Sequence, residues 1–260
     1  MQKKTKYIVL RQKHKSCSFV NKHLLINGIP LKRIGNDCTD SSVKFLGITI
    51  DEHLTWQKHL AQVNSKISLA MFAIKQVKHI LPRDILKNLY FALIHPHLSY
   101  GILAWGNANQ TILRKTKMLQ KRAIRTINKA AFNSHTDPLF HSAQILKLDD
   151  LYQYSSALFM YDYINNNLPR SFDNIFSLNK DIQTTYVTRQ SDQLYIERCL
   201  SNFASKLPLY TLPQMWSKWT NIASGVTSRA QFKRHIITSF VLSYPTQVNK
   251  CFNKCCPDYH

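Results

Sequence analysis

Two groups of residues in this sequence have side chains that could hold a metal ion. Asp149 and Asp150 are adjacent and carry the carboxylates that Mg²⁺ prefers. They precede an amphipathic run, where acidic residues favour the first turn of a helix. Zinc-ligand types gather near the end of the sequence, at Cys251, Cys255, Cys256 and His260. Because their C-x3-C-C-x3-H spacing differs from that of common zinc knuckles, we predict no metal site in this chain.

Histidines supply the other candidates for chemistry. His95 and His97 are separated by one proline, and His59 lies one helical turn after Trp56. A turn capped by the proline explains the first pair without catalysis. An aromatic anchor beside a hydrogen-bonded histidine explains the second. The sequence contains no Gly-rich phosphate loop and no nucleophile motif. A metal-dependent hydrolase built on these histidines and the aspartate pair stays open as an alternative hypothesis.

The stretch from about Thr111 to Ala131 gives the strongest indication of a binding surface. At about 100° per residue, its seven cations fall on one side of a helix. They are Arg114, Lys115, Lys117, Lys121, Arg122, Arg125 and Lys129. The opposite side carries Leu113, Thr116, Leu119, Ala123, Ile124 and Ile127. Solvated helix faces usually mix charge signs, because like charges one turn apart repel. We therefore interpret the cationic side as a contact for phosphates, with a solvated surface as the alternative.

The charge of the whole chain favours a polyanionic partner. Its 35 Lys and Arg residues outnumber 14 Asp and Glu residues, giving a formal net charge of +21. Ranges 1–36 and 85–136 contain no carboxylate, so we expect their basic residues to be solvated or bound to an anion. Nucleic acid is the first candidate partner and an acidic membrane surface the second. The uncharged range 88–113 contains too many polar residues for a membrane span.

Six scattered cysteines show no disulfide framework, and the start of the chain lacks the apolar run of a signal peptide. We therefore expect an intracellular protein, in the nucleus or the cytoplasm.

The pattern of apolar residues predicts strands first and helices afterwards. Short strands are expected at 7–10, 24–26, 29–34 and 43–50, with a hairpin turn at Asn27-Gly28. Gly47 interrupts the last strand and indicates a bulge or the close approach of another backbone. From Trp56 on, spacings of three and four predict helices, separated by loops at 170–193 and 207–213. Ser228 and Gln231 fit the capping box of a last helix.

These patterns predict an α+β fold. A short antiparallel sheet, one side of a larger sheet, precedes a mostly α-helical region. We divide the chain into strands at 1–55, a basic helical region at 56–170 and a helical extension with a polar loop at 171–260.

Several segments together resemble the reverse transcriptase domain of non-LTR retrotransposons of the LINE or jockey-like kind. They are KTKYIVL at 4–10, VKFLGITID at 43–51, LTWQKH at 54–59, LYFALIHPHLSYGILAWG at 89–106 and LQKRAIRTI at 119–127. The resemblance covers most of the chain. It implies the end of the palm, the primer grip, the thumb and the helical region that follows.

The resemblance also implies residues that contact nucleic acid. Lys4 matches the basic residue of the segment after the catalytic hairpin, and Phe45, Leu46 and Gly47 match the primer-grip turn. Lys6 and Lys44, beside these residues, are also predicted contacts. Residues 120–125 match the helical side that faces the duplex. Together with Arg114, Lys117 and Lys129 from the helix pattern, these are the predicted contacts.

The departure from the family pattern concerns catalysis. In the family, the Asp-Asp box lies upstream of the position of Lys4, and this sequence has no such box. We therefore expect a truncated copy without fingers or most of the palm, inactive by itself, which binds an RNA–DNA primer–template duplex. The Mg²⁺ of the full-length enzyme is not expected in this chain. A self-contained basic nucleic-acid-binding protein without a polymerase role is the alternative.

Overall fold

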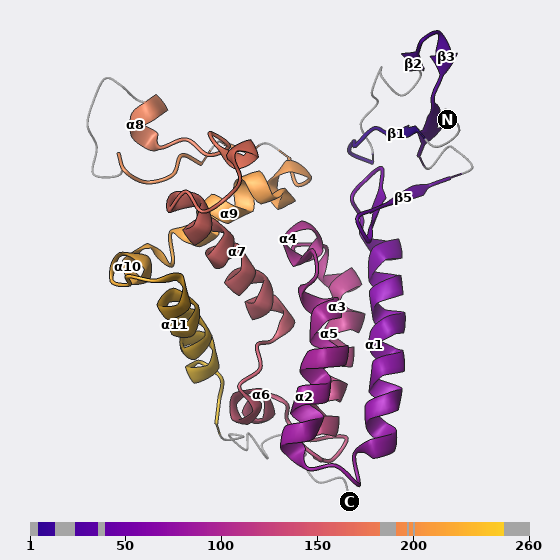
Figure 1. The fold of residues 1–260 in the computed structure, drawn as a ribbon, viewed down its shortest axis with the longest axis vertical. Coiled ribbons are helices and arrows are strands. Elements are labelled where there is room, and N and C mark those ends of the chain that lie inside the picture. Colours follow the sequence, from indigo (N-terminus) through magenta and orange to yellow (C-terminus); the bar gives the residue numbers. More distant parts are fainter. Residues whose placement is uncertain are drawn as a thin grey trace, which may run out of the picture.

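The computed structural model describes residues 5–13, 24–35, 40–182, 191–196, 198–199 and 201–246. Its strands are β1 (Lys6–Ile8), β2 (Leu25–Ile26), β3 (Ile29–Pro30), β4 (Lys32–Ile34), β5 (Ser42–Phe45) and β6 (Ile48–Asp51). Helices α1 (Gln57–Val77), α2 (Arg83–Leu93), α3 (His95–Ser99), α4 (Ile102–Trp105), α5 (Gln110–Ile127) and α6 (Asp137–Ala143) follow. The rest are α7 (Leu148–Ile164), η3 (Arg170–Phe172), α8 (Asn179–Ile182), η4 (Ala204–Lys206), α9 (Pro208–Trp216), α10 (Thr220–Ser224) and α11 (Arg229–Leu242). The predicted α+β class is confirmed, with the strands at one end of the helices (Figure 1).

The described strands form three separate two-stranded sheets. β2 and β3 pair antiparallel around Asn27 and Gly28, as predicted, and both turn residues have positive φ. β5 and β6 also pair antiparallel. β1 pairs parallel with β4, which differs from the all-antiparallel arrangement expected from the sequence. A parallel pair needs a long connection between its strands, and the residues between β1 and β4, which include the β2–β3 hairpin, provide one.

The range 43–50 is a hairpin rather than one interrupted strand. Phe45 of β5 pairs with Ile48 of β6, so Leu46 and Gly47 alone form the turn. Their φ angles are 44° and 83°, as a two-residue turn of type I′ requires. The expected bulge at Gly47 was therefore wrong. The group that approaches Gly47 is a side chain and not the expected backbone, since a Cβ on Gly47 would lie 3.3 Å from Cε1 of Tyr100.

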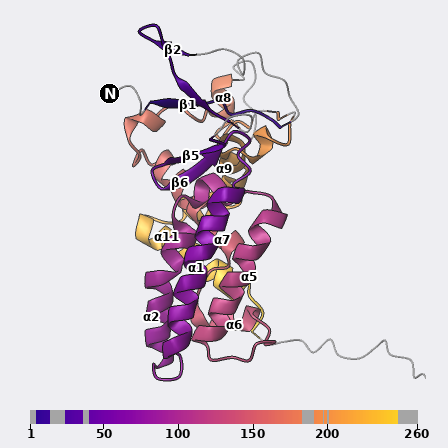
Figure 2. The same cartoon turned by 90° about the vertical axis from the view of Figure 1, so that its right-hand side faces the viewer.

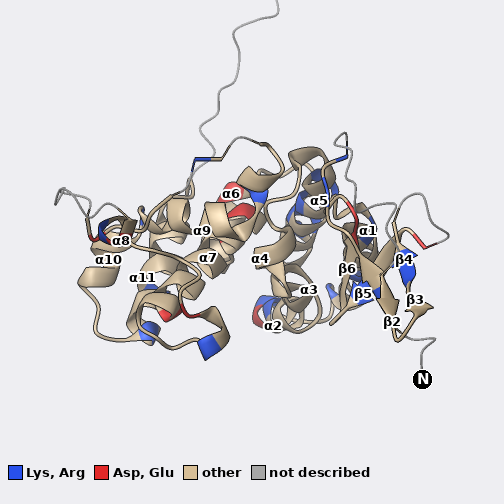
Figure 3. Cartoon of the chain, turned by 90° about the horizontal axis from the view of Figure 1, so that it is seen from above, with Lys and Arg blue, Asp and Glu red and all other residues tan. Residues whose placement is uncertain are grey.

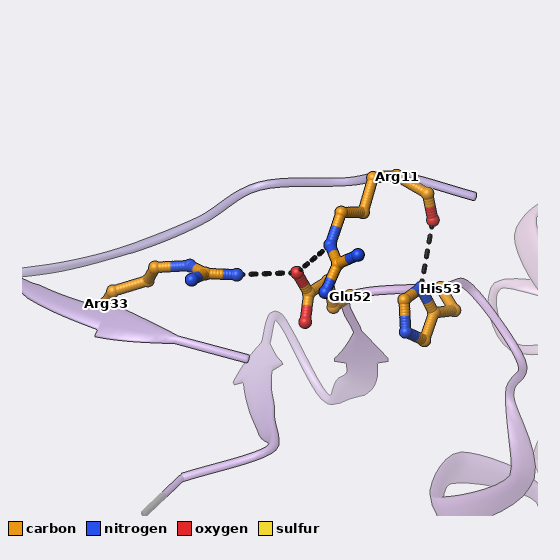
Figure 4. A network of polar contacts seen from close by, with 4 residues as sticks. All are labelled: Arg11, Arg33, Glu52 and His53. Carbon is orange, nitrogen blue, oxygen red and sulfur yellow. Dashed lines mark hydrogen bonds and ion pairs between the residues drawn. The ribbon is translucent and has the colours of Figure 1, made fainter. Parts of the chain in front are cut away.

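A fully buried carboxylate joins the N-terminal strands to the rest of the molecule (Figure 4). Glu52 follows β6, and its Oε1 accepts hydrogen bonds from Nε of Arg11 at 2.5 Å and from Nη2 of Arg33 at 2.6 Å. The backbone N–H of Arg11 also donates to the carbonyl oxygen of Glu52 at 3.0 Å. Gly35 leaves room for this carboxylate, since a Cβ there would lie 2.8 Å from Oε2. The segments around β1 and β4 are thus fixed at the start of the helical region.

Asp51 holds the turn that leads into the first long helix. Its carboxylate accepts hydrogen bonds from the backbone N–H groups of Thr55 at 3.0 Å and Trp56 at 3.1 Å. Both residues precede α1, and no side-chain hydrogen bond caps the helix at Trp56. The change from strands to helices, predicted at this point of the sequence, therefore falls in a turn that Asp51 stabilises.

Helices α1, α2 and α5 pack side by side (Figure 2). Their facing sides contribute nearly half of the buried residues of the larger hydrophobic core. The apolar spacings predicted for α1 and α5 are confirmed, because their buried residues lie on one side of each helix. Two buried polar pairs cross this core. Thr116 donates to Oδ1 of Asn64 at 2.8 Å, and Nε2 of Gln120 donates to the hydroxyl of Tyr90 at 3.1 Å.

The C-terminal half has a second core between α7, α9 and α11. It consists of Ala157, Met160, Tyr161, Leu212, Trp216, Trp219, Phe232 and Ile236. The loop predicted at 207–213 was wrong, because α9 covers most of it. Pro208 occupies the first helical position, which proline tolerates, and burial of Leu212 and Trp216 against α7 outweighs the cost of Pro213 inside the helix. Ser228 caps α11 by accepting a hydrogen bond from the N–H of Gln231, as predicted.

In the part of the chain that the structure describes, no helix has both the length and the apolar character to cross a membrane. The three-part division of the chain stays a prediction.

Candidate nucleic-acid interface

Helix α5 presents its cations on the side away from the core. Figure 3 shows blue Lys and Arg segments along this helix. Leu113, Thr116, Leu119, Ala123, Ile124 and Ile127 are buried, whereas Arg114, Lys115, Lys121 and Arg122 are exposed. The predicted amphipathic arrangement is therefore confirmed for the helix itself. The helix ends at Ile127, so Lys129 lies in the turn after α5 and not on the helical face that its spacing predicted. We call Arg114, Lys115, Lys117, Lys121, Arg122, Arg125 and Lys129 the cationic side of α5.

Several basic residues that have no acidic neighbour in the sequence form ion pairs with acidic residues from distant parts of the chain. Lys117 pairs with Asp149 of α7 at 2.7 Å, and Arg11 and Arg33 pair with Glu52. Lys6 and Lys32 both contact Asp40. The expectation that these cations must be solvated or bound to an anion was therefore wrong. Among the described residues, the other six members of the cationic side of α5 form no ion pair.

Lys6, a predicted contact for nucleic acid, is already paired with a carboxylate. Its Nζ lies 3.1 Å from Oδ2 of Asp40, and Nζ of Lys32 lies 2.9 Å from the same oxygen. The two ammonium groups, Lys32 foremost, hold the pKa of Asp40 below its ordinary value. Lys6 therefore reaches a phosphate only in competition with this carboxylate. Lys4, the neighbouring predicted contact, lies outside the described residues.

A first hollow, of about 500 Å³, lies along the amino-terminal half of α5. Its lining consists of Gln110, Thr111, Arg114, Lys117, Met118 and Lys121. Nζ of Lys117 also donates to Oε1 of Gln110 at 2.6 Å, so this lysine lies against the helix instead of extending into water.

A second hollow, of about 380 Å³, lies at the other end of α5, and we call it the Phe132 hollow. Its lining consists of Lys75, Lys78, Arg122, Arg125, Thr126, Lys129, Ala130 and Phe132. Five of these residues are cations and none is acidic. Lys75 and Lys78 come from the end of α1, and sequence reasoning missed them because only the packing of α1 against α5 brings them to this place. Their position in the last turn of an amphipathic helix was the available signal.

One residue of the segment predicted to face a duplex is part of the core. Gln120 is 2% exposed, and its amide donates to the hydroxyl of Tyr90 at 3.1 Å and to the carbonyl oxygen of Leu146 at 2.9 Å. Its Oε1 accepts from the N–H of Leu148 at 2.9 Å. Burial also raises the pKa of Tyr90. Gln120 thus ties α5 to α2 and to the start of α7, and it does not contact a ligand on the cationic side.

The hairpin residues form a separate exposed group. Lys44, Phe45, Leu46 and Gly47 are all exposed, and Leu46 reaches 75%. The hydroxyl of Tyr100, the residue directly after α3, donates a hydrogen bond to the carbonyl oxygen of Leu46 and so supports the turn. A leucine that is both exposed and in the left-handed region costs stability, and such outliers cluster at functional sites.

Behind this hairpin, His59 and His97 line a hollow of about 260 Å³ together with Lys44, Lys66 and Tyr100. His59 is buried between the rings of Trp56 and Trp105, with centroid distances of 6.4 Å and 6.0 Å. Its Nδ1 accepts from the N–H of Thr49 at 3.4 Å. Burial, assisted by the charge of Lys66, lowers the pKa of both histidines. The packing of His59 beside Trp56 is as expected, but the expected hydrogen-bonded histidine is confirmed only at Nδ1, because its buried Nε2 has no hydrogen-bond partner among the described residues.

The predicted contacts do not share one surface. Gln62 and Lys66 of α1 line the hairpin hollow, and on a helical wheel they lie within roughly 40° of each other. Lys75 and Lys78 line the Phe132 hollow, and they lie roughly 160° to 220° from Gln62 on the same wheel. The hairpin hollow and the Phe132 hollow thus lie on opposite sides of α1.

The adjacent aspartates occupy the first turn of α7, as predicted. Asp149 pairs with Lys117, and Asp150 accepts a hydrogen bond from the hydroxyl of Tyr244. Within the described residues, no three His, Cys, Asp or Glu side chains are grouped so that they could hold a metal ion. The C-terminal cysteines and His260 lie outside the described residues. Both aspartates thus have structural partners that do not suit a Mg²⁺ site.

Comparisons with known proteins give partial matches. No protein-family model and no solved structure matches the chain. The RNA-directed DNA polymerase from mobile element jockey of Drosophila melanogaster is 28% identical over 149 residues, which are 54% of this chain and 16% of that protein. Its counterpart in Drosophila funebris is 24% identical over 110 residues, 41% of this chain and 12% of that protein.

The probable RNA-directed DNA polymerase from transposon BS of Drosophila melanogaster is 31% identical over 98 residues, 35% of this chain and 10% of that protein. The matched stretches thus span 16% or less of the length of these relatives. Over about half of its own length, the chain is distantly similar to the reverse transcriptases of jockey and BS non-LTR retrotransposons.

Proposed function

We propose that this chain holds an RNA–DNA primer–template duplex by its backbone, as a non-catalytic part of a retrotransposon reverse transcriptase. The observation that carries the proposal is the cationic side of α5, where six of seven cations have no carboxylate partner among the described residues. The similarity to RNA-directed DNA polymerases supports nucleic acid as the anion. We propose that it acts inside the cell, in the nucleus or cytoplasm.

The dimensions of α5 suit a phosphate backbone. From Arg114 to Arg125 the helix rises about 16 Å, at 1.5 Å per residue. A duplex carries about one charge per 1.7 Å of its axis, so roughly ten phosphate charges lie within that length. Lysine and arginine side chains on a rigid helix contact these phosphates without reading base edges, and binding should therefore be independent of sequence.

The catalytic step is proposed to belong to another part of such an enzyme. Asp149 and Asp150 are occupied by Lys117 and Tyr244 and do not form a pair of free carboxylates. The Mg²⁺ of polymerisation would require carboxylates that converge on the metal. A metal-dependent hydrolase is disfavoured by the same contacts.

A second candidate function is that of a self-contained nucleic-acid-binding protein. The observation in its favour is the continuity of the two hydrophobic cores, which meet along α7 and enclose aromatic residues in both halves. A monodisperse sample that unfolds in one cooperative transition would favour this candidate. Aggregation of the isolated chain would instead indicate that it needs the fingers and palm of a polymerase in order to fold stably.

The test of duplex binding is charge removal on the cationic side of α5. Arg114→Gln, Lys121→Gln and Arg122→Gln together remove three exposed cations without touching the core. We expect the dissociation constant for an RNA–DNA duplex, measured by fluorescence anisotropy, to rise at least about tenfold at low salt. The slope of log K against log salt should shrink by about 2.7, at about 0.9 per lost phosphate contact.

The matched control removes the same charge elsewhere. Lys218→Gln, Lys233→Gln and Arg234→Gln change exposed cations in and before α11. If both triple variants bind equally well and keep the same salt slope, the cationic side of α5 is only solvated. Extension of a primer by the purified chain with Mg²⁺ and nucleotides would contradict the non-catalytic assignment.

A further inference from the structure

The aromatic side chain of Phe132 is exposed to solvent in this fold. It is 81% exposed, although a phenylalanine gains stability from burial. Phe132 lies at the tip of a turn over residues 131–134, which the N–H of Ser134 closes by donating to the carbonyl oxygen of Ala131 at 3.1 Å. Nε of Arg125 donates to the carbonyl oxygen of Ser134 at 2.8 Å. The turn is thus fixed to α5, and the ring stays exposed.

The backbone just before this turn is also unusual. The N–H of Ala130 donates to the carbonyl oxygen of Arg125 at 3.0 Å, and the N–H of Lys129 donates to that of Thr126 at 3.2 Å. This is the Schellman pattern, in which the left-handed residue is usually glycine. Here it is Lys129, with φ of 52°. The chain accepts a strained backbone and gains a cation in the wall of the Phe132 hollow.

Cations surround the exposed ring. Lys75, Lys78, Arg122, Arg125 and Lys129 line the hollow, and none of them has a carboxylate partner among the described residues. Positive side chains beside an aromatic platform suit a single-stranded nucleic acid, because phosphates contact the cations while an unpaired base stacks on the ring. A duplex offers only its phosphates, since its bases are already stacked and paired.

We propose that the Phe132 hollow binds the unpaired strand at a duplex–single-strand junction. One unpaired base stacks on Phe132, and the phosphates on either side contact the five cations. The inference rests on the proposed function of α5 as the duplex contact and adds the ligand at its carboxyl end. It also assigns Lys75, Lys78 and Phe132 a role that the helix pattern of α5 did not indicate.

The experiment compares three RNA–DNA duplexes by fluorescence anisotropy: blunt, with an overhang of about six nucleotides, and with the same overhang made abasic. We expect the overhang to tighten binding about tenfold over the blunt duplex. The abasic overhang keeps its phosphates and should lose most of that gain. A 2-aminopurine placed in the overhang should change its fluorescence when it stacks on the ring.

Two variants and one control assign the effect to the ring. Phe132→Ala should bind the overhang no better than the abasic overhang, whereas Phe132→Trp should keep the gain. Phe72→Ala is the control, because Phe72 is exposed on α1 and does not line the hollow. Since Phe132 makes few contacts, thermal melting of both alanine variants should match the parent chain.

The outcomes separate this inference from the proposed function. If the blunt duplex binds but the overhang adds nothing, or adds as much when abasic or in Phe132→Ala, the inference is overturned and duplex binding stands. If the blunt duplex fails to bind, the proposed function falls. A six-nucleotide single strand tested alone then decides the inference by its dependence on Phe132. Equal binding of polyglutamate would also overturn it.

Discussion

Lys117 and Asp149 form an ion pair of 2.7 Å that joins the cationic side of α5 to the first turn of α7. The pair places a negative charge at the edge of a surface proposed to bind phosphates. Asp149 therefore competes with the ligand for Lys117, and the strength of that competition can be measured.

Replacement of Asp149 by Asn should strengthen duplex binding. Lys117 becomes available for one further phosphate, so the slope of log K against log salt should steepen by about 0.9. Stability should change by less than about 1 kcal/mol, because the pair is partly exposed. Titrations at several salt concentrations give both the dissociation constant and the slope.

The control for this variant is Asp192→Asn. Asp192 pairs with Lys180 at 3.2 Å, far along the chain from α5, and its replacement changes the net charge equally. If both variants strengthen binding to the same extent, the gain comes from net charge alone and Lys117 is not at the interface.

Replacement of Glu52 by Gln should detach the N-terminal strands. The neutral side chain leaves the partly buried guanidinium groups of Arg11 and Arg33 without their shared counter-charge. Breaking a buried ion pair from one side costs about 3–5 kcal/mol. Amide hydrogen exchange should become faster in β1 and β4 and stay slow in α1 and α5, because the larger core does not include this carboxylate.

The control is Asp40→Asn on the same strands. Asp40 pairs with Lys6 and Lys32 while 40% of its side chain stays exposed, so its loss should leave the exchange of β1 and β4 nearly unchanged. Equal exchange in the Glu52 variant and the parent chain would show that the two arginine contacts do not hold the strands.

Local periodicity predicted the long helices of this fold well. α1 and α5 each bury one side against the rest of the molecule, and burial on one side leaves a repeat of three and four in the sequence. The turn at Leu46 and Gly47 left no such signal. Its geometry depends on Tyr100, which contacts the turn from 54 positions further along the chain.

Only those residues of the candidate site that lie on a single helix could be predicted from the sequence. The cations of α5 lie on one helix, so their spacing placed most of them on one side. Lys75 and Phe132 join that surface through the packing of α1 against α5 and through the turn that Arg125 holds. The pairing of Lys117 with Asp149 likewise depends on contacts between distant segments, which spacing along the chain does not encode.

Replacement of Lys129 by Gly should separate stability from binding. Glycine adopts positive φ without the strain that a lysine meets there, so the free energy of unfolding should stay equal or rise by up to about 1 kcal/mol. Binding should weaken because one cation leaves the Phe132 hollow. Chemical denaturation and anisotropy on the same sample measure the two effects.

A matched variant separates backbone from charge at this position. Lys129→Gln keeps a side chain on the strained backbone but removes its charge, so it should bind as weakly as the glycine variant without any gain in stability. If Lys129→Gly binds as tightly as the parent chain, Lys129 does not contact the ligand.

Asp150 should make stability depend on pH in a defined direction. Burial raises the pKa of its carboxyl group above the ordinary 3.8, although the hydroxyl of Tyr244 and the charge of Lys147 oppose the shift. The folded state therefore holds this proton more tightly than the unfolded state. Its contribution to stability is fully present at pH values below the pKa of Asp150 in the unfolded state. It is lost as the pH rises through the pKa of Asp150 in the folded state.

Asp150→Asn removes this dependence, because a neutral amide accepts the hydrogen bond of Tyr244 without a buried charge. Relative to the parent chain, the variant should be more stable at pH 7, and the difference should shrink as pH falls toward 4. Tyr244→Phe should have the opposite effect at pH 7, since the buried carboxylate then loses its donor. Chemical denaturation of the three proteins across this range measures the difference; a constant offset would contradict a raised pKa at Asp150.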